Sequence, residues 1–115
     1  MNRVLSQYIC VNSTDIRTRT VVEFDTDDTI IALFPLDREN VESANTLFFD
    51  GVISGEFSEK DIVPVSSANI FEFIGMHTKP IVVTEKNQLL IWKNLDFLNK
   101  KIGEKCRVMA LKSIV

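Results

Sequence analysis

The sequence predicts an α+β fold in which mostly antiparallel strands form a curved sheet or a small open barrel beside two short helices. Three observations lead to this prediction. Several segments alternate apolar and polar residues with the period of a half-buried strand, turn-forming clusters separate these segments, and two stretches combine helical spacing with capping residues. The chain has 115 residues, 45% apolar and 25% charged, so we expect a single domain over residues 1–115.

The first third of the chain is expected to form three strands. Residues 3–12 are rich in β-branched and aromatic side chains and end at a cluster that favours a turn. Residues 18–25 alternate in polarity, which predicts a hairpin through residues 12–17. The apolar run 29–34 is continuous, as is typical of a central strand, and Pro35 ends it.

A helix followed by a tight hairpin is expected next. The helix is predicted from Asp37 to Thr46, because Asp37 can cap it and acidic side chains lie near its N-terminus, where the helix dipole favours negative charge. Asp50 and Gly51 then stand between two short apolar segments. This pair is a strong signal for a two-residue hairpin.

Eleven residues of the chain nearly recur, since Val41–Gly51 and Val65–Gly75 share six identical positions. The residues around the two copies differ, which argues against a duplicated unit, and the second copy is compatible with a strand or a helix. The copies share polar corners that can cap an element or, beside an aromatic ring, line a pocket for a planar polar ligand. These corners and rings are Ser43, Asn45, Phe49, Ser67, Asn69 and Phe73.

The last third of the chain predicts a hairpin, a helix and a strand. Residues 81–84 and 88–92 have strand composition and flank a compact polar turn. Asn94 can cap a second helix from Leu95 to Ile102, whose apolar residues share one face. Residues 105–115 have the period-two pattern of a strand, and we expect a final strand that lies inside the sheet.

Charge is distributed unevenly along the chain. Residues 1–75 hold thirteen Asp or Glu and five Lys or Arg, a net of −8, whereas residues 76–115 hold three and eight, a net of +5; together they give −3. Folding can bring the two parts together so that they neutralise each other. Head-to-tail self-association and a basic patch for an anionic partner are the alternatives. A nucleic-acid partner is disfavoured because the pI is about 5.1.

The sequence also bears on the compartment of the protein. No apolar run approaches the roughly 20 residues that cross a bilayer, and the N-terminus lacks the apolar region of a signal peptide. We therefore expect a cytoplasmic protein without a membrane partner. In that setting Cys10 and Cys106 are expected to be free thiols.

Residues with chemical potential are few. His77 is the one histidine, and no spacing ties it to a nucleophile, so an enzyme is disfavoured and a small hydrolase stays a minor alternative. Asp25, Asp27 and Asp28 lie close together, but the chain lacks the Gly and the distal Glu that an EF-hand loop needs at set positions. We therefore expect no metal and no cofactor, and interpret these acids as a solvated turn.

Two functional hypotheses of different class follow. The first is a non-enzymatic interaction module, an acidic inhibitor or immunity-type protein that binds a basic protein partner. It would bind through Asp25, Asp27 and Asp28 and through candidate surface phenylalanines, which are Phe48, Phe49, Phe57 and Phe73. The second is a protein that sequesters a small nucleotide-like anion at a subunit interface, using the polar corners with Lys79 or the C-terminal basic residues. His77 is a further candidate for partner or ligand binding. A nucleic-acid-binding module that uses the basic C-terminal segment is a further alternative.

Overall fold

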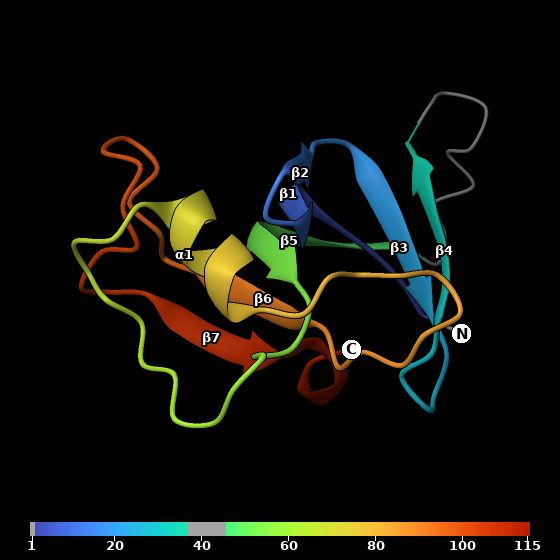
Figure 1. Ribbon diagram of the computed structural model, residues 1–115. Helices are drawn as coiled ribbons and strands as arrows, with labels where there is room; N and C mark the ends of the chain where they lie inside the picture. Colours follow the sequence, from blue (N-terminus) through green and yellow to red (C-terminus); the bar gives the residue numbers. More distant parts are fainter. Residues whose placement is uncertain (1, 37–45) are drawn as a thin grey trace.

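A mixed seven-stranded sheet forms the body of the computed structural model, which describes residues 2–36 and 46–115 (Figure 1). The strand order is β4-β3-β1-β5-β6-β7, and β2 pairs only with β1. Every pair is antiparallel except β1·β5, which is parallel. The strands are β1 (Asn2–Asn12), β2 (Asp15–Arg17), β3 (Thr20–Phe24), β4 (Ile30–Pro35), β5 (Thr46–Ser54), β6 (Leu90–Lys93) and β7 (Arg107–Ala110).

The predicted α+β class is wrong. Within the described ranges the chain is mostly β, with one α-helix, α1 (Ile70–His77), and a short 3-10 helix, η2 (Leu111–Ser113), and its sheet is neither wholly antiparallel nor a barrel. The central strand β1 explains the mixed topology. It pairs antiparallel with β2 and β3 and parallel with β5, so the single parallel pair lies at the centre of the sheet.

Successive residues of the central strands pack into two separate cores, one on each face of the sheet. In β6, Ile91 belongs to one core and Trp92 to the other. The helix-side core consists of Cys10, Val52, Ile70, Phe73, Ile74, Leu90, Trp92 and Ile102. The loop-side core consists of Val4, Ile9, Val11, Val22, Phe24, Ile30, Ile53, Ile81, Leu89, Ile91 and Leu111. Full burial of each such aliphatic side chain contributes about 1.5–3 kcal/mol.

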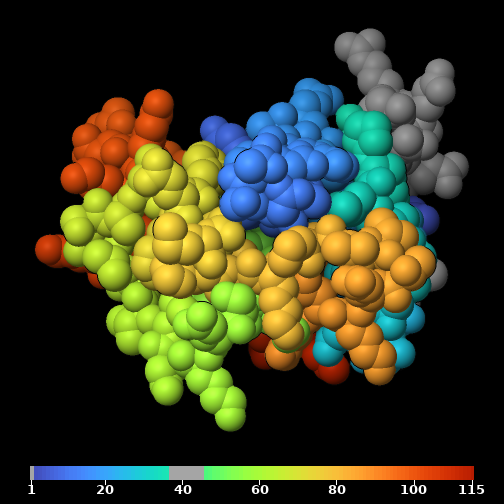
Figure 2. All heavy atoms as spheres, viewed as in Figure 1, coloured from blue at the N-terminus to red at the C-terminus, as the bar shows by residue number. Residues whose placement is uncertain are grey.

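The segment from Thr78 to Leu89 covers the loop-side core and is not the predicted hairpin strand. It crosses from α1 to β4 and back to β6, and Figure 2 shows it lying against the N-terminal strands. The buried side chain of Asn87 fixes it by accepting from the Glu56 amide at 2.7 Å and donating to the Pro80 carbonyl at 3.0 Å. The backbone of residues 81–84 pairs with other strands, since the Ile81 amide donates to the Val11 carbonyl at 2.8 Å and the Thr84 amide to the Ile30 carbonyl at 2.7 Å, so it does not pair with residues 88–92.

Strand β5 runs straight through Asp50 and Gly51, so the predicted hairpin is wrong. Gly51 has φ +120°, and the register of β5 against β1 shifts between Ser6 and Tyr8, as in a β-bulge. A Cβ atom at Gly51 would lie 2.0 Å from the Trp92 carbonyl oxygen. The glycine therefore serves a bulge and a close backbone approach instead of a turn.

Helix α1 begins in the second copy of the near-repeat. Asn69 is its N-cap, and its side-chain oxygen accepts from the amides of Phe71 and Glu72, each at 3.1 Å. The predicted capping role of Asn69 is confirmed. The matching residues of the first copy, from Thr46 to Gly51, belong to a strand. The two copies are therefore not one structural unit used twice. The first predicted helix, from Asp37 to Thr46, lies outside the described residues except for Thr46, which begins β5.

Loss of this cap has a measurable cost. Replacing Asn69 with Ala is expected to lower the free energy of unfolding by about 1 kcal/mol, because two amides of the first helical turn lose their acceptor. Urea denaturation followed by circular dichroism measures the loss. The conservative Asn69→Asp variant keeps an acceptor and should stay near the wild type, so equal losses in both variants would contradict the capping role.

The second predicted helix, from Leu95 to Ile102, is also wrong. Asp96 and Lys101 exchange backbone hydrogen bonds at 3.0 and 2.9 Å, which closes a tight turn. Lys100 has φ +56°, a left-handed value that no helix interior allows. Leu98 is 93% exposed, whereas Ile102 is fully buried and Leu95 packs against the core, so the three residues do not form one buried helical face. Without that burial, a helix of eight residues has too little to stabilise it.

Two predicted central strands lie at the edges of the sheet. Strand β4 pairs with β3 on one side only, and Pro35 at its end cannot donate to a further strand. The C-terminal strand β7 covers only Arg107–Ala110, and η2 turns the chain away at Leu111, which enters the loop-side core. The apolar character of these segments reflects burial of one face against a core, not a position inside the sheet.

Candidate functional site

The acidic turn between β3 and β4 uses its carboxylates to hold its own backbone. Asp25 Oδ1 accepts from the amides of Asp27 at 3.1 Å and Thr29 at 3.2 Å, and Asp27 Oδ1 also accepts from the Thr29 amide at 3.1 Å. Asp28, with φ +67°, occupies the left-handed position of the turn. The hydrogen bonds with Asp25, then those with Thr29, lower the pKa of Asp27 to about 2.

This turn should weaken in acid. Because the pKa of Asp27 falls from 3.8 to about 2 on folding, its contribution to stability is fully present above pH 3.8 and is lost as the pH falls toward 2. Thermal unfolding at pH steps across this interval, on the wild type and on Asp27→Asn, measures it. The melting-temperature advantage of the wild type should shrink as the pH falls; an advantage independent of pH would contradict the assignment.

The acidic turn also meets the basic part of the chain. Lys112 Nζ lies 3.3 Å from Asp28 Oδ2, and Lys86 Nζ lies 3.8 Å from Asp27 Oδ2. A third pair, between Lys79 and Glu56 at 2.9 Å, joins the same two parts. The two oppositely charged parts of the sequence therefore neutralise each other within the fold, which is the first of the predicted arrangements. The carboxylates of Asp27, Asp28 and Glu56 therefore form ion pairs within the chain.

His77 and Lys79 lie at the C-terminal end of α1 without a catalytic arrangement. The His77 ring packs against the Phe73 ring with 4.5 Å between centroids and 47° between the ring planes. The hydrogen bonds of the described residues give its imidazole no carboxylate or nucleophile as a partner. Lys79 forms the ion pair with Glu56 and also donates its backbone amide to the Glu56 carbonyl at 2.8 Å. Both residues therefore have structural contacts.

The predicted polar corners and rings do not come together. Phe73 lies in the helix-side core, whereas Phe49 packs against the loop-side core. Ser67 is exposed in the turn before α1, and the Asn69 oxygen is used by the cap. Ser43 and Asn45 lie outside the described residues. An open surface depression near this helix is lined instead by Ser13, Glu72, Gly75 and Met76.

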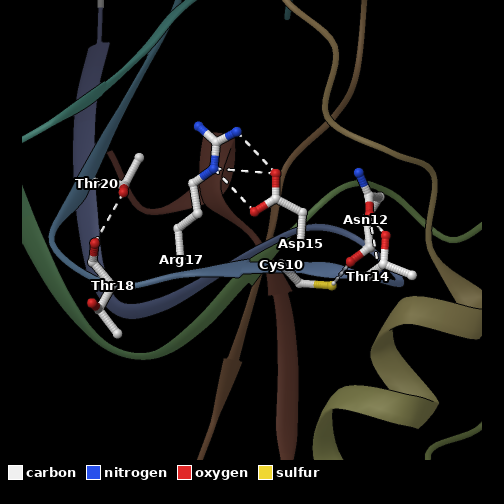
Figure 3. A network of polar contacts seen from close by, with 7 residues as sticks. All are labelled: Cys10, Asn12, Thr14, Asp15, Arg17, Thr18 and Thr20. Atoms are coloured by element: carbon white, nitrogen blue, oxygen red, sulfur yellow. Dashed lines mark hydrogen bonds and ion pairs between the residues drawn. The ribbon is translucent and has the colours of Figure 1, made fainter.

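The turn after β1 confirms the predicted hairpin between residues 12 and 17. Asn12 Oδ1 accepts from the Thr14 amide at 2.9 Å and the Thr14 hydroxyl at 3.0 Å, and Arg17 pairs with Asp15 at 2.9 Å (Figure 3). Cys10 begins this hairpin network, and its thiol lies 3.4 Å from the Asn12 carbonyl oxygen. Burial raises the pKa of Cys10 to about 11, so the thiol stays protonated and unreactive near neutral pH.

Both cysteines are free thiols, as the sequence predicts. Cys10 belongs to the helix-side core and Cys106 packs against the same core. Burial also raises the pKa of Cys106. Neither thiol has the exposed, cationic surroundings that activate a nucleophilic cysteine. No group of three or more His, Cys, Asp or Glu side chains within residues 2–36 and 46–115 could hold a metal ion.

The N-terminal half of β5 is the most exposed apolar part of the sheet. β1 borders β5 along one edge, but β6 pairs with Val52–Ser54 only. Along Thr46–Asp50, the second edge has no partner strand among the described residues. Leu47 is 49% exposed and Phe48 is 58% exposed, and as successive residues they point to opposite faces. Of the phenylalanines proposed as surface residues, Phe48 is the exposed one; Phe57 contacts Trp92.

The two end strands of the sheet, β4 and β7, have features that prevent pairing with another chain. β4 ends in Pro35, and β7 is only four residues long and begins with the exposed Arg107. Prolines, short strands and charged side chains prevent an edge from pairing with another chain. The open part of β5, which we call the β5 edge (Thr46–Asp50), carries Asp50 at its end but two exposed apolar side chains before it. Sequence reasoning missed this edge because it placed a turn at Asp50 and Gly51.

Comparison with protein-family models, with curated proteins and with solved structures finds no match for this chain. Among the residues that the structure describes, no helix is both long enough and apolar enough to cross a membrane. Any functional conclusion therefore depends on the geometry of the chain itself, of which the β5 edge is the least expected feature.

Proposed function

We propose that this chain is a non-enzymatic protein-interaction module that binds by adding an extended segment of its partner to the β5 edge. One observation carries the proposal: the β5 edge combines unpaired backbone groups with the exposed side chains of Leu47 and Phe48. In a strand with one neighbour, every second residue directs its N–H and C=O groups away from that neighbour. An added strand satisfies these groups, and the flanking side chains select it.

The contacts of the other candidate residues support a module without catalysis. Asp25 and Asp27 stabilise their own turn, His77 packs against Phe73, and the Asn69 oxygen caps α1. Each of these side chains has a structural partner that accounts for its type. Leu47 and Phe48 of the β5 edge are 49% and 58% exposed, and an exposed strand edge with apolar side chains favours pairing with another chain.

The sequence also suggests a narrower function, that of an acidic inhibitor or immunity-type protein. This function requires a partner with a basic surface. The acids of the β3–β4 turn are engaged with the backbone and with Lys86 and Lys112, so they do not supply its binding surface in this proposal. That prediction has its own test. Binding through the turn would weaken as salt rises and would be lost on charge reversal at Asp27.

Panning of random displayed peptides against the full chain tests the proposal. We expect enriched peptides with strand-forming sequences that protect alternate amides of Thr46–Asp50 from hydrogen exchange. Phe48→Glu should weaken their binding at least about tenfold, because about 1.5–3 kcal/mol of aromatic burial is lost. Met76→Glu is the matched control, since Met76 is 72% exposed on α1 and should leave binding unchanged.

Two results would contradict the proposal. One is enrichment of peptides that protect α1 or the β3–β4 turn while Thr46–Asp50 keeps exchanging. The other is full binding by Phe48→Glu. Circular dichroism and thermal unfolding of both variants establish that they are folded, which we expect because the two side chains are more than half exposed.

A further inference from the structure

Two cationic residues lie opposite each other at the Asp50 end of the β5 edge. Lys93 of β6 is the register partner of Arg107 of β7. Like charges in directly opposed positions of an antiparallel pair destabilise the sheet. Within residues 2–36 and 46–115, neither side chain forms an ion pair. The register thus places two cationic residues side by side, and neither has an ion-pair partner within those ranges.

Lys93 marks the point at which β5 changes from a paired to an open strand. The last register pair of β5 and β6 joins Val52 to Trp92, and the Gly51 backbone lies against the Trp92 carbonyl. Lys93 follows directly, with its Nζ 5.8 Å from the centroid of the Phe49 ring. A strand added to the β5 edge would continue the line of β6, and its near end would meet Lys93 and Arg107.

We propose that the occupant of the β5 edge is an extended segment of a partner protein with acidic residues at its N-terminal end, followed by alternating apolar residues. This inference rests on the proposed function. The segment runs antiparallel to β5, in the direction of β6, so its first residues lie at the cationic pair. Its carboxylates separate and neutralise Lys93 and Arg107, while its apolar side chains cover Leu47 and Phe48.

Asp50 is the carboxylate of the β5 edge itself, and it allows a second test of the preference for an acidic segment. It is exposed beside Gly51, close to the expected position of the acidic residues along the strand. It therefore reduces affinity for an acidic segment by like-charge repulsion. Asp50→Asn should strengthen binding of an acidic segment and weaken binding of a basic one.

The experiment compares three peptides of about eight residues, the length of a short strand, on the full chain. All three alternate valine and threonine, and they begin with two Glu, two Gln or two Lys. Calorimetry should rank them Glu tightest and Lys weakest, with at least about fivefold between neighbours, the effect of one exposed ion pair of about 1 kcal/mol. The double variant Lys93→Glu with Arg107→Glu should reverse the order. Lys60→Glu with Lys100→Glu makes the same change of net charge at exposed positions elsewhere and should keep the order.

Each other outcome overturns a defined part of the argument. If the three peptides bind equally and Phe48→Glu abolishes the binding of all three, the acidic preference is wrong and the proposed function still holds. No binding of any peptide, with Thr46–Asp50 still exchanging, would overturn both. A wild-type dimer in sedimentation that Phe48→Glu dissociates would identify a second copy as the occupant. Single-stranded RNA whose binding is lost with Lys93 and Arg107 would identify the cations as a nucleic-acid site.

Discussion

Replacing Trp92 with Ala is expected to lower the free energy of unfolding by about 4 kcal/mol, the largest effect of any single change considered for this chain. Trp92 is fully buried in the helix-side core. Its ring makes edge contacts with Phe57 at 5.6 Å and Phe73 at 6.1 Å, and its Nε1 donates to Ser54 Oγ at 2.8 Å. Truncation therefore removes a large buried surface and leaves Ser54 without its donor.

Guanidinium denaturation followed by circular dichroism measures this loss, since the variant has no tryptophan to report by fluorescence. Trp92→Phe is the matched control. It keeps an aromatic ring but removes the hydrogen bond to Ser54, and it should cost about 1–2 kcal/mol. A loss below about 1 kcal/mol in the alanine variant would mean that Trp92 does not join α1 to the sheet as described. A total stability of about 5–15 kcal/mol is usual for a domain, so 4 kcal/mol is a large fraction.

Replacing Gly51 with Ala is expected to cost about 3 kcal/mol. The backbone at Gly51 has φ +120°, which an L side chain rarely adopts, and the new Cβ would lie 2.0 Å from the Trp92 carbonyl oxygen. The strands β5 and β6 would have to separate to accommodate it. Chemical denaturation measures the change in stability, and hydrogen exchange at Val52 and Ile53 reports the local separation.

Gly103 provides the control for this effect. It also has a positive φ, +80°, but a Cβ there would meet its nearest neighbour, Asp96 Cβ, at 3.4 Å. Gly103→Ala should therefore cost only the backbone strain, about 1 kcal/mol. If the two variants lost equal stability, the close approach of Gly51 to β6 would not be the cause.

These two positions also show what the sequence can and cannot predict. The burial of Trp92 follows from its apolar neighbours, and the strands around β1 and β3 follow from their alternating residues. Gly51 was interpreted as a hairpin because Asp-Gly suits a tight turn. The conformation that makes glycine favourable in a turn also makes it favourable in a bulge, and only the position of β6 decides between them.

The second predicted helix failed for a similar reason. Asn94, the acidic first turn and the terminal lysines satisfied every local rule from Leu95 to Ile102. A short helix is nevertheless stabilised mainly by burial of its apolar face, and Leu98 is almost wholly exposed. Asp96 and Lys101 instead close a tight turn, and Asn94 and Lys100 have positive φ values. The spacing of apolar residues does not predict this turn.

The candidate site was the part least accessible from sequence. The cap at Asn69 could be predicted because it depends on neighbours two and three positions away. The β5 edge depends instead on which strands lie beside β5 and on where β6 ends, and both are properties of the topology. Likewise, the opposition of Lys93 and Arg107 follows from the register of two strands that are far apart along the chain.

The parallel pairing of β1 with β5 sets an order for folding. The hydrogen bond from the Gly51 amide to the Gln7 side chain spans 44 positions, so the central pair closes a long loop before it gains any contact energy. The antiparallel ribbon of β3 and β4 closes a much shorter one. Folding limited by such a distant pairing takes about milliseconds to seconds. Leu47 and Phe48 are thus positioned only once a long-range pairing has formed, and we expect newly folding chains to be most prone to associate before it.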